Sequence, residues 1–250
     1  MADNSRIEWT SSTWNPVTGC DKVSPGCEHC YADRMAKRLQ AMGVKKYRNG
    51  FEVTLHPDVL EQPTSWIRPR VIFVNSMSDL FHEKVPTEYV QQIFDVIRRC
   101  PQHIFQVLTK RSKRLVRAAD KLDWPDNLWM GVTVESPTYK FRIDDLRKTP
   151  AALKWLSLEP LIDPLGQLDL TDIAWAVVGG ESGPGARPMK EKWVYEIRHQ
   201  CRAQHTAFFF KQWGGVNKKQ AGRLLRGRLY NEMPEIPGHS SESILKALAG

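Results

Sequence analysis

Short apolar runs recur along the chain and alternate with longer amphipathic or charged stretches. The runs are rich in β-branched and aromatic residues, as is typical of buried parallel strands. They cover residues 71–74, 104–108, 128–132, 153–156, 173–178 and 207–210. The stretches between them predict helices, most clearly at 87–100, which Pro101 follows, and at 190–204. Strands that alternate with helices predict βαβ units and therefore a parallel sheet.

A first strand at 14–18 brings the count to about seven units, which is enough for a partial or full TIM-like (β/α) barrel of parallel strands. Residues 51–55 are either another short strand or a packed loop, and a helix is expected from Tyr31 to Met42. We expect an α/β barrel with an N-terminal cysteine loop over residues 1–215. Residues 216–250 then form a basic C-terminal extension that packs on or near the barrel.

Polar residues follow the predicted strands at the point where each strand ends. The carboxyl ends of parallel strands and the loops after them hold the ligand site in such folds, so one cavity lined from many directions is expected. Helix capping explains Ser, Thr and Asp at these places, but it does not explain Lys110, Glu159 and Glu181. The stretches concerned are 75–79, 109–111, 133–135, 157–160, 179–182 and 211–214.

Three of the five cysteines crowd together as Cys20-x6-Cys27-x2-Cys30, in a loop with Gly19, Pro25 and Gly26. Thiolates in such a loop bind an iron–sulfur cluster or zinc. Three thiolates leave one iron of a [4Fe–4S] cluster open, whereas structural zinc takes four closed ligands, and we therefore favour the cluster. Zinc stays an alternative, completed by His29, His56 or His82, and so do three unligated thiols. Cys100 and Cys201 are given no role.

The balance of charge adds a candidate partner. Lys and Arg number 36 against 28 Asp and Glu, which gives a net charge of +8. Basic segments with interleaved aromatic residues, at 34–48, 110–117 and 216–230, favour a nucleic acid or a nucleotide, although each alone also suits a solvated basic face. No stretch has the roughly 20 apolar residues of a membrane span, and no apolar h-region follows the first residues. We expect a cytoplasmic protein without a membrane partner.

Several motifs resemble those of a family common in phages and prophages and known for its three-cysteine motif. The motifs are residues 7–10, 13–20, 73–81, 108–111, 179–183, 210–214 and 232–234, so the resemblance covers nearly the whole chain. The family is placed with the radical S-adenosylmethionine (SAM) enzymes. Residues 78–81 and 108–111 are also similar to motifs of the spore photoproduct lyase branch of that superfamily. The chain departs from the usual C-x3-C-x2-C spacing, and His29 stands where an aromatic residue usually precedes the third cysteine.

The resemblance implies a radical SAM barrel with a [4Fe–4S] cluster on Cys20, Cys27 and Cys30. It further implies SAM cleavage to a 5′-deoxyadenosyl radical and an electron donor such as flavodoxin or ferredoxin. The residues at the strand ends would bind SAM: Asn75, Ser76, Asp79, Thr109, Lys110, Thr133, Glu135, Gly179 and Gly180. Lys110, Glu159 and Glu181 would act in catalysis. A structural salt bridge between Asp79 and Lys110 is the alternative for those two residues.

The leading hypothesis is a radical SAM enzyme that modifies or repairs a nucleic-acid base or a nucleotide, as a lyase, isomerase or transferase. One alternative is a radical SAM enzyme acting on a small metabolite or peptide. The other is a zinc-stabilised nucleic-acid-binding module without catalysis. The chain contains no G-x-S-x-G elbow, no phosphate-binding P-loop and no H-E-x-x-H helix. Glu159 and Glu181 could instead form a glycosidase-like pair of carboxylates, but this hypothesis is second to the first because it leaves the cysteine loop unexplained.

Overall fold

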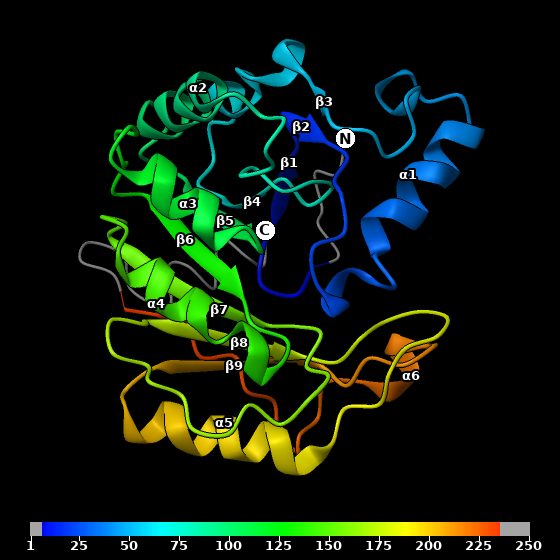
Figure 1. Cartoon of the computed structure of the whole chain (residues 1–250), viewed down its shortest axis with the longest axis vertical. Coiled ribbons are helices and arrows are strands. Elements are labelled where there is room, and N and C mark those ends of the chain that lie inside the picture. The colour runs from blue at the N-terminus through cyan, green and yellow to red at the C-terminus, as the bar shows by residue number, and fades with distance from the viewer. Residues whose placement is uncertain (1–6, 236–250) are drawn as a thin grey trace.

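Seven parallel strands form the main sheet of the computed structural model, which describes residues 7–235 (Figure 1). The strand order is β1-β4-β5-β6-β7-β8-β9, so β1 and β9 are the two edge strands of a half-barrel. The strands are β1 (Ser12–Trp14), β4 (Val71–Val74), β5 (Ile104–Thr109), β6 (Leu128–Thr133), β7 (Leu153–Leu158), β8 (Trp175–Gly179) and β9 (Ala207–Gln212). The predicted parallel α/β fold is therefore confirmed, as a partial barrel.

Within residues 7–235, six α-helices accompany the sheet (Figure 1). They are α1 (Tyr31–Ala41), α2 (Thr87–Arg98), α3 (Ser112–Ala119), α4 (Phe141–Arg147), α5 (Glu191–Ala203) and α6 (Lys218–Ala221). Short 3₁₀ helices occur at Pro25–Cys27, Lys45–Tyr47, Pro57–Val59, Gln62–Ser65 and Pro137–Tyr139. Helix α2 ends just before Pro101, as its sequence predicts, because a proline cannot continue the hydrogen-bond ladder. Within residues 7–235 no helix is both long and apolar enough to cross a membrane.

The predicted first strand, 14–18, is in fact divided into two. Strand β1 ends at Trp14 and joins the main sheet, while β2 (Val17–Thr18) pairs with β3 (Thr54–Leu55) in a separate antiparallel pair. The break falls at Asn15 and Pro16, where proline removes a backbone donor from the ladder. Residues 51–55 thus contain a short strand in their second half.

Aromatic side chains fill the inner face of the half-barrel. Trp9, Trp129, Trp155 and Trp175 are buried, and the rings of Trp9 and Trp155 meet edge to face at 5.3 Å between centroids. Gly131 on β6 leaves room for this packing, since a Cβ there would lie 2.4 Å from the Trp155 ring. A separate core lies between the sheet and its helices and includes Ile72, Phe94, Leu115, Leu146 and Ile197.

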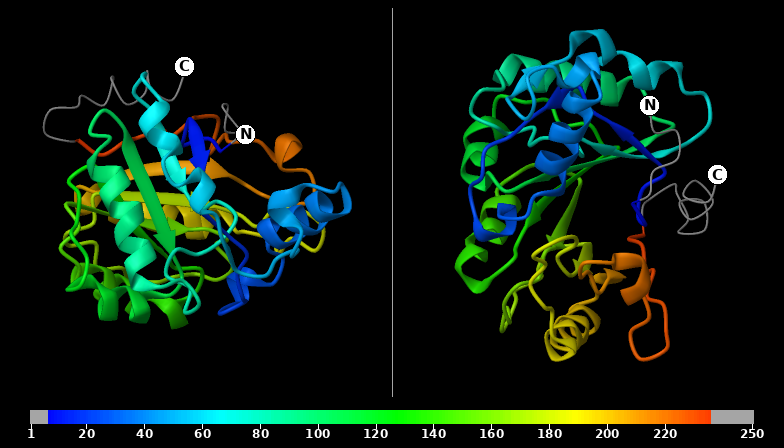
Figure 2. Two further views of the ribbon diagram at one scale, coloured as in Figure 1. Left: turned by 90° about the horizontal axis from the view of Figure 1, so that it is seen from above. Right: turned by 90° about the vertical axis from the view of Figure 1, so that its right-hand side faces the viewer.

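The free edge at β9 is covered by a later segment of the chain. Phe210 donates its backbone N–H to the carbonyl of Tyr230 over 2.9 Å, and Met233 packs into the tryptophan cluster. This segment belongs to the expected C-terminal extension, of which residues 236–250 lie outside the described part of the chain. Helices α1 and α6 both lie on the right of Figure 1, and the right-hand panel of Figure 2 views the molecule from that side.

Candidate active site

A cavity of about 150 Å³ at the carboxyl ends of β4, β5 and β6 brings the three clustered cysteines together with predicted polar residues. Phe73 and Leu108 line it as well, and both pack against the tryptophan cluster. The residues that the sequence singles out and that line this cavity are Cys20, Cys27, Cys30, Asn75, Ser76, Asp79, Thr109, Lys110 and Thr133. The structure therefore gathers residues from the cysteine loop and from three successive strands at one place.

The cysteine loop is anchored at its start by close backbone packing. Gly19 has a φ of 86°, and a Cβ there would lie 2.1 Å from the carbonyl oxygen of Glu52, so glycine is required. Its N–H donates to the carbonyl of Met77 over 2.9 Å, and the N–H of Cys20 donates to that of Phe51 over 3.1 Å. These contacts fix the point at which the loop enters the cavity.

All three thiols are half-buried and line the same cavity. Burial, together with the negative charge of Asp79, raises the pKa of Cys20 to about 12. This thiol is therefore protonated at neutral pH until a metal displaces the proton. Within residues 7–235 no group of three His, Cys, Asp or Glu side chains is arranged as a ready metal site.

The histidines that would complete a zinc site have other partners. His56 shares a hydrogen bond of 2.7 Å with the hydroxyl of Thr18, and His82 bonds Asp21 over 3.0 Å. Neither these two nor His29 is among the described residues that line the cavity. The described residues that line the cavity add no histidine to the three cysteines, and three thiolates fit a cluster that leaves one iron open better than they fit a closed zinc site.

Asp79 joins the ends of β4 and β5. Its carboxylate accepts hydrogen bonds from the N–H of Phe81, the hydroxyl of Thr109 and the N–H of Lys110, over 3.0, 2.7 and 3.1 Å. The Lys110 ammonium bonds instead to the hydroxyl of Thr133, over 3.2 Å. In the described structure no ion pair joins the side chains of Asp79 and Lys110, so the ammonium keeps its charge uncompensated beside the cavity.

Asn75 contributes a hydrogen-bond donor without a partner. Its backbone has a φ of 63°, which asparagine tolerates, and its Oδ1 accepts from the N–H of Val17 over 3.3 Å. The Nδ2 group is buried and has no partner among the described residues, although Asn75 lines the cavity. A buried amide group without a hydrogen-bond partner costs free energy, and a bound acceptor would remove that cost. Ser76, by contrast, donates to Asn15.

Glu135 lies behind the cysteine loop. It forms a fully buried ion pair with Arg142 over 2.8 Å, and its second oxygen, Oε1, has no partner among the described residues. A Cβ on Gly26 would lie 3.2 Å from this carboxylate, so the side chain packs directly against the loop. Glu135 is not among the residues that line the cavity.

The remaining predicted residues gather at the carboxyl ends of β7, β8 and β9. The Lys211 ammonium donates to both oxygens of Glu159 over 2.9 Å, and Gln212 donates to the same carboxylate over 3.3 Å. Gly179 and Gly180 make room for close packing: a Cβ would lie 3.2 Å from Glu159 in the first case and 2.0 Å from the Trp213 carbonyl in the second. These residues lie outside the lining of the cysteine cavity.

Glu181 is held by Arg187, a residue that the sequence reasoning missed. The guanidinium Nε and the backbone N–H of Arg187 donate to one Glu181 oxygen over 2.8 and 2.9 Å, and Nη2 donates to the other. Burial raises the pKa of this carboxyl, but the hydrogen bonds from Arg187 outweigh burial and leave the pKa below its ordinary value. No periodicity marks Arg187 in the sequence, because it lies in an irregular loop.

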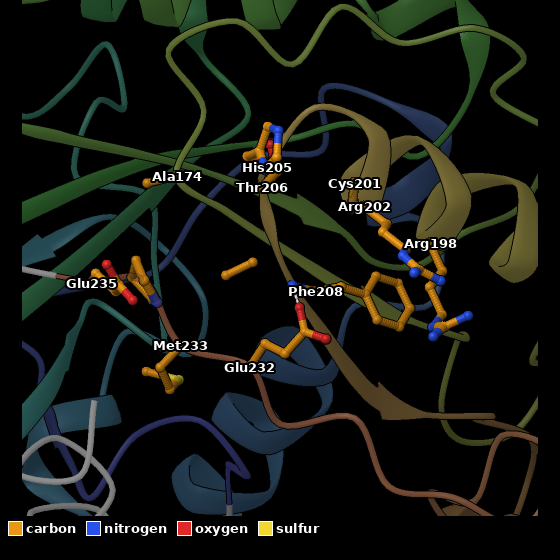
Figure 3. Close-up of a pocket in the computed structure, with 12 residues that line it drawn as sticks. Ala174, Arg198, Cys201, Arg202, His205, Thr206, Phe208, Glu232, Met233 and Glu235 are labelled. Atoms are coloured by element: carbon orange, nitrogen blue, oxygen red, sulfur yellow. Dashed lines mark hydrogen bonds between the residues drawn. The ribbon is translucent and has the colours of Figure 1, made fainter. Parts of the chain in front are cut away.

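A larger cavity, of about 630 Å³, opens at the other end of the sheet, where β8 and β9 begin (Figure 3). Arg198 and Arg202 border it on one side, and Glu232 and Met233 border it on another. No residue predicted for catalysis or cofactor binding lines this cavity. The predicted site residues therefore lie at the carboxyl end of the sheet, and not at this larger cavity.

A model of the family of proteins of unknown function DUF5131 matches residues 4–234. The chain belongs to this family. No curated protein matches it. Two solved structures of spore photoproduct lyase do match, one complexed with dinucleoside spore photoproduct and one a mutant with bound AdoMet and the same dinucleoside. Each is 13% identical with a TM-score of 0.44, and the match covers 74% of this chain and 59% of the lyase chain. The chain of this DUF5131 protein thus spans 59% of the length of those lyase chains.

Proposed function

We propose that this DUF5131 protein is a radical SAM enzyme that holds a [4Fe–4S] cluster on Cys20, Cys27 and Cys30. The observation that carries the proposal is the single cavity onto which all three cysteines open, at the carboxyl end of a parallel half-barrel. When bound, a cluster of this kind supplies the electron with which SAM is cleaved to a hydrogen-abstracting radical.

The polar residues of the cavity fit the amino-acid part of SAM. The unpaired Nδ2 of Asn75 and the Lys110 ammonium are both donors, and together they suit a carboxylate. Asp79 holds the Lys110 backbone in place, because its carboxylate accepts from the N–H of Lys110 and from the hydroxyl of the preceding Thr109. Ser76 and Thr133 line the same cavity and remain proposed SAM contacts.

Glu135, Gly179 and Gly180 are proposed to act from the periphery of the SAM site. Glu135 supports the cysteine loop through its contact with Gly26, and its unpaired Oε1 is a free acceptor. Glu159 and Glu181 are proposed for the substrate side, since they follow β7 and β8, away from the cysteines.

We propose a nucleic-acid base or a nucleotide as the substrate. The net charge of +8 supports this, and so do the basic segments 34–48 and 216–230. Part of the charge of each basic segment is paired within the chain: Lys37 with Asp33, Arg226 with Glu191, and Arg114 and Arg117 with Glu83. An acidic electron-transfer protein such as flavodoxin or ferredoxin is proposed as the reductant.

Electron paramagnetic resonance of anaerobically purified, dithionite-reduced protein tests the proposal. A [4Fe–4S]⁺ signal that shifts when SAM is added is expected in the wild-type protein, and Cys27→Ala is expected to abolish both the signal and SAM cleavage. Cys100→Ala is the matched control, because Cys100 is buried beside α2 and far from the loop in sequence. An intact cluster in Cys27→Ala, or stoichiometric zinc in place of iron, would refute the assignment, and zinc would favour the non-catalytic binding module.

A further inference from the structure

The half-barrel is open between its two edge strands, yet its carboxyl end is bridged. Strands β1 and β9 do not pair with each other. The bridge is the segment from Glu181 to Arg187, which follows β8 and reaches the cysteine loop that follows β2. It therefore joins the two sides of the open sheet at the end where the cysteine cavity lies.

Arg187 makes the contact with the cysteine loop. Its Nη2 donates to the carbonyl of Pro25 over 2.9 Å, and its Nη1 donates to the carboxylate of Glu28 over 3.2 Å. The same guanidinium is oriented by Glu181, which is itself buried. Pro25 and Glu28 flank Cys27 in the 3₁₀ turn, so this one side chain holds the turn from both ends.

A second set of contacts joins the segment to helix α1, which begins directly after Cys30. Arg34 of α1 donates to the carbonyl of Ser182 over 3.0 Å. A Cβ on Gly183 would lie 2.4 Å from the Arg34 guanidinium, and one on Gly185 would lie 2.9 Å from the ring of His29. Both glycines also have a positive φ, which other residues rarely adopt, so glycine suits these two positions where the segment lies against Arg34 and His29.

The other side of the segment is fixed to the end of β9. Gln212 donates to the hydroxyl of Ser182 over 2.6 Å, and the N–H of Gly215 donates to the carbonyl of Glu181 over 2.7 Å. The N–H of Gly183 returns a bond to the carbonyl of Gly215 over 3.0 Å. The segment is thus supported by the sheet and is not a free loop.

We propose that residues 181–187 clamp the cysteine loop across the open side of the half-barrel, and that Arg187 is the residue that positions the loop. The inference rests on the proposed function, because the turn that it holds carries Cys27. The clamp keeps Cys27 and Cys30 at the cavity and limits opening of the loop. Arg187 touches neither thiol nor ligand in this role and acts only through Pro25 and Glu28.

Hydrogen exchange of the amides in residues 20–30 tests the clamp directly, in the full-length protein with and without iron. The N–H of Cys27 and the N–H of Glu28 report on the turn, since they bond to the carbonyls of Ser24 and Pro25. Arg187→Gln should speed exchange there about tenfold, because two charge-assisted hydrogen bonds to the turn are lost. Arg187→Lys should give a smaller increase, since it keeps the charge but not the fork of donors.

Arg147→Gln is the matched control. Arg147 is also a partly buried arginine with several bonds, donating to Asp144 over 2.6 Å and to the Thr171 carbonyl over 2.9 Å, in a different part of the fold. It should leave exchange in residues 20–30 unchanged. Exchange in folded Arg187→Gln protein that matches the wild type, or an equal rise in Arg147→Gln, would overturn the clamp. Faster exchange in the metal-free Arg187→Gln variant would support the clamp whether or not iron binds. A wild-type protein that never binds iron would refute the proposed function alone.

Discussion

Replacing Asp79 by asparagine separates a positioning role from a ligand-binding one. Each Asp79 oxygen is already occupied: Oδ1 accepts from Phe81 and Thr109, and Oδ2 accepts from the N–H of Lys110. The side chain is 7% exposed. In the asparagine variant an NH₂ group takes the place of one oxygen, so that two donors face each other at the backbone N–H of Lys110 or at that of Phe81.

The size of the effect follows from these bonds. A hydrogen bond to a charged group contributes about 1.5–3 kcal/mol, and a buried donor left without an acceptor costs about 1–3 kcal/mol. The two effects overlap at the same contact, so Asp79→Asn should lower the free energy of unfolding by about 2–4 kcal/mol. Thr109→Val should cost about 1–2 kcal/mol, because Thr109 also accepts from the N–H of Arg111 over 2.9 Å.

Urea unfolding of the two single variants and the double variant measures the coupling between these side chains. The double variant should lose less than the sum of the two single losses, by about 1–2 kcal/mol, since both remove the same hydrogen bond. Strict additivity, or a loss below about 0.5 kcal/mol in Asp79→Asn, would refute the three-bond arrangement. Asp79 would then be free to contact a ligand directly.

Three further predictions concern the core, the pH dependence and the cavity. Gly131→Ala should cost about 2–3 kcal/mol in urea unfolding, because its Cβ would overlap the packed Trp155 ring; a cost below about 0.5 kcal/mol would contradict this. Burial holds the pKa of His103 below its ordinary 6.5, so the unfolded chain binds a proton at a higher pH than the folded chain does. The free energy of unfolding therefore falls as the pH drops below about 6.5, by at most about 1.4 kcal/mol per pH unit. Unfolding of His103→Asn and wild-type protein at pH 7.5 and 5.5 should show a shallower pH dependence in the variant, and equal slopes would contradict the assignment. Lys110→Met should weaken SAM binding to the iron-loaded protein at least tenfold in calorimetric titration, with little change in stability, because its ammonium bonds only to a hydroxyl; unchanged affinity would remove Lys110 from the SAM site.

Six of the seven strands of the sheet, β4 to β9, were predictable because each is a short apolar run, and the runs account for these six strands other than their exact ends. The gathering of Asn75, Asp79, Thr109 and Lys110 around one cavity was predictable too, because parallel strands present their carboxyl ends together. The division of residues 14–18 was not foreseen, although Pro16 marks it. The sequence of residues 14–18 does not show that β1 joins the main sheet while β2 pairs with β3.

The sequence did not show which charged side chains pair with one another. Counting charges in residues 110–117 gives a basic segment, but Glu83 lies far away in the chain and neutralises part of it in space. The same holds for Glu181. Its position after a strand predicts that it lies at a ligand site, whereas in the structure it is hydrogen-bonded to Arg187. Such partners come from irregular loops, where no periodic pattern relates one residue to the other.

The two lysines that end strands show what this pairing means for the site. Lys110 keeps an uncompensated charge beside the cysteines, whereas Lys211 is balanced by both oxygens of Glu159. An anionic group would therefore be stabilised electrostatically beside Lys110, whereas beside Lys211 it would gain little electrostatic stabilisation. At the balanced side the Lys211 ammonium lies 5.9 Å from the ring of Trp9, which is itself buried, so Glu159 and this ring already stabilise the Lys211 charge.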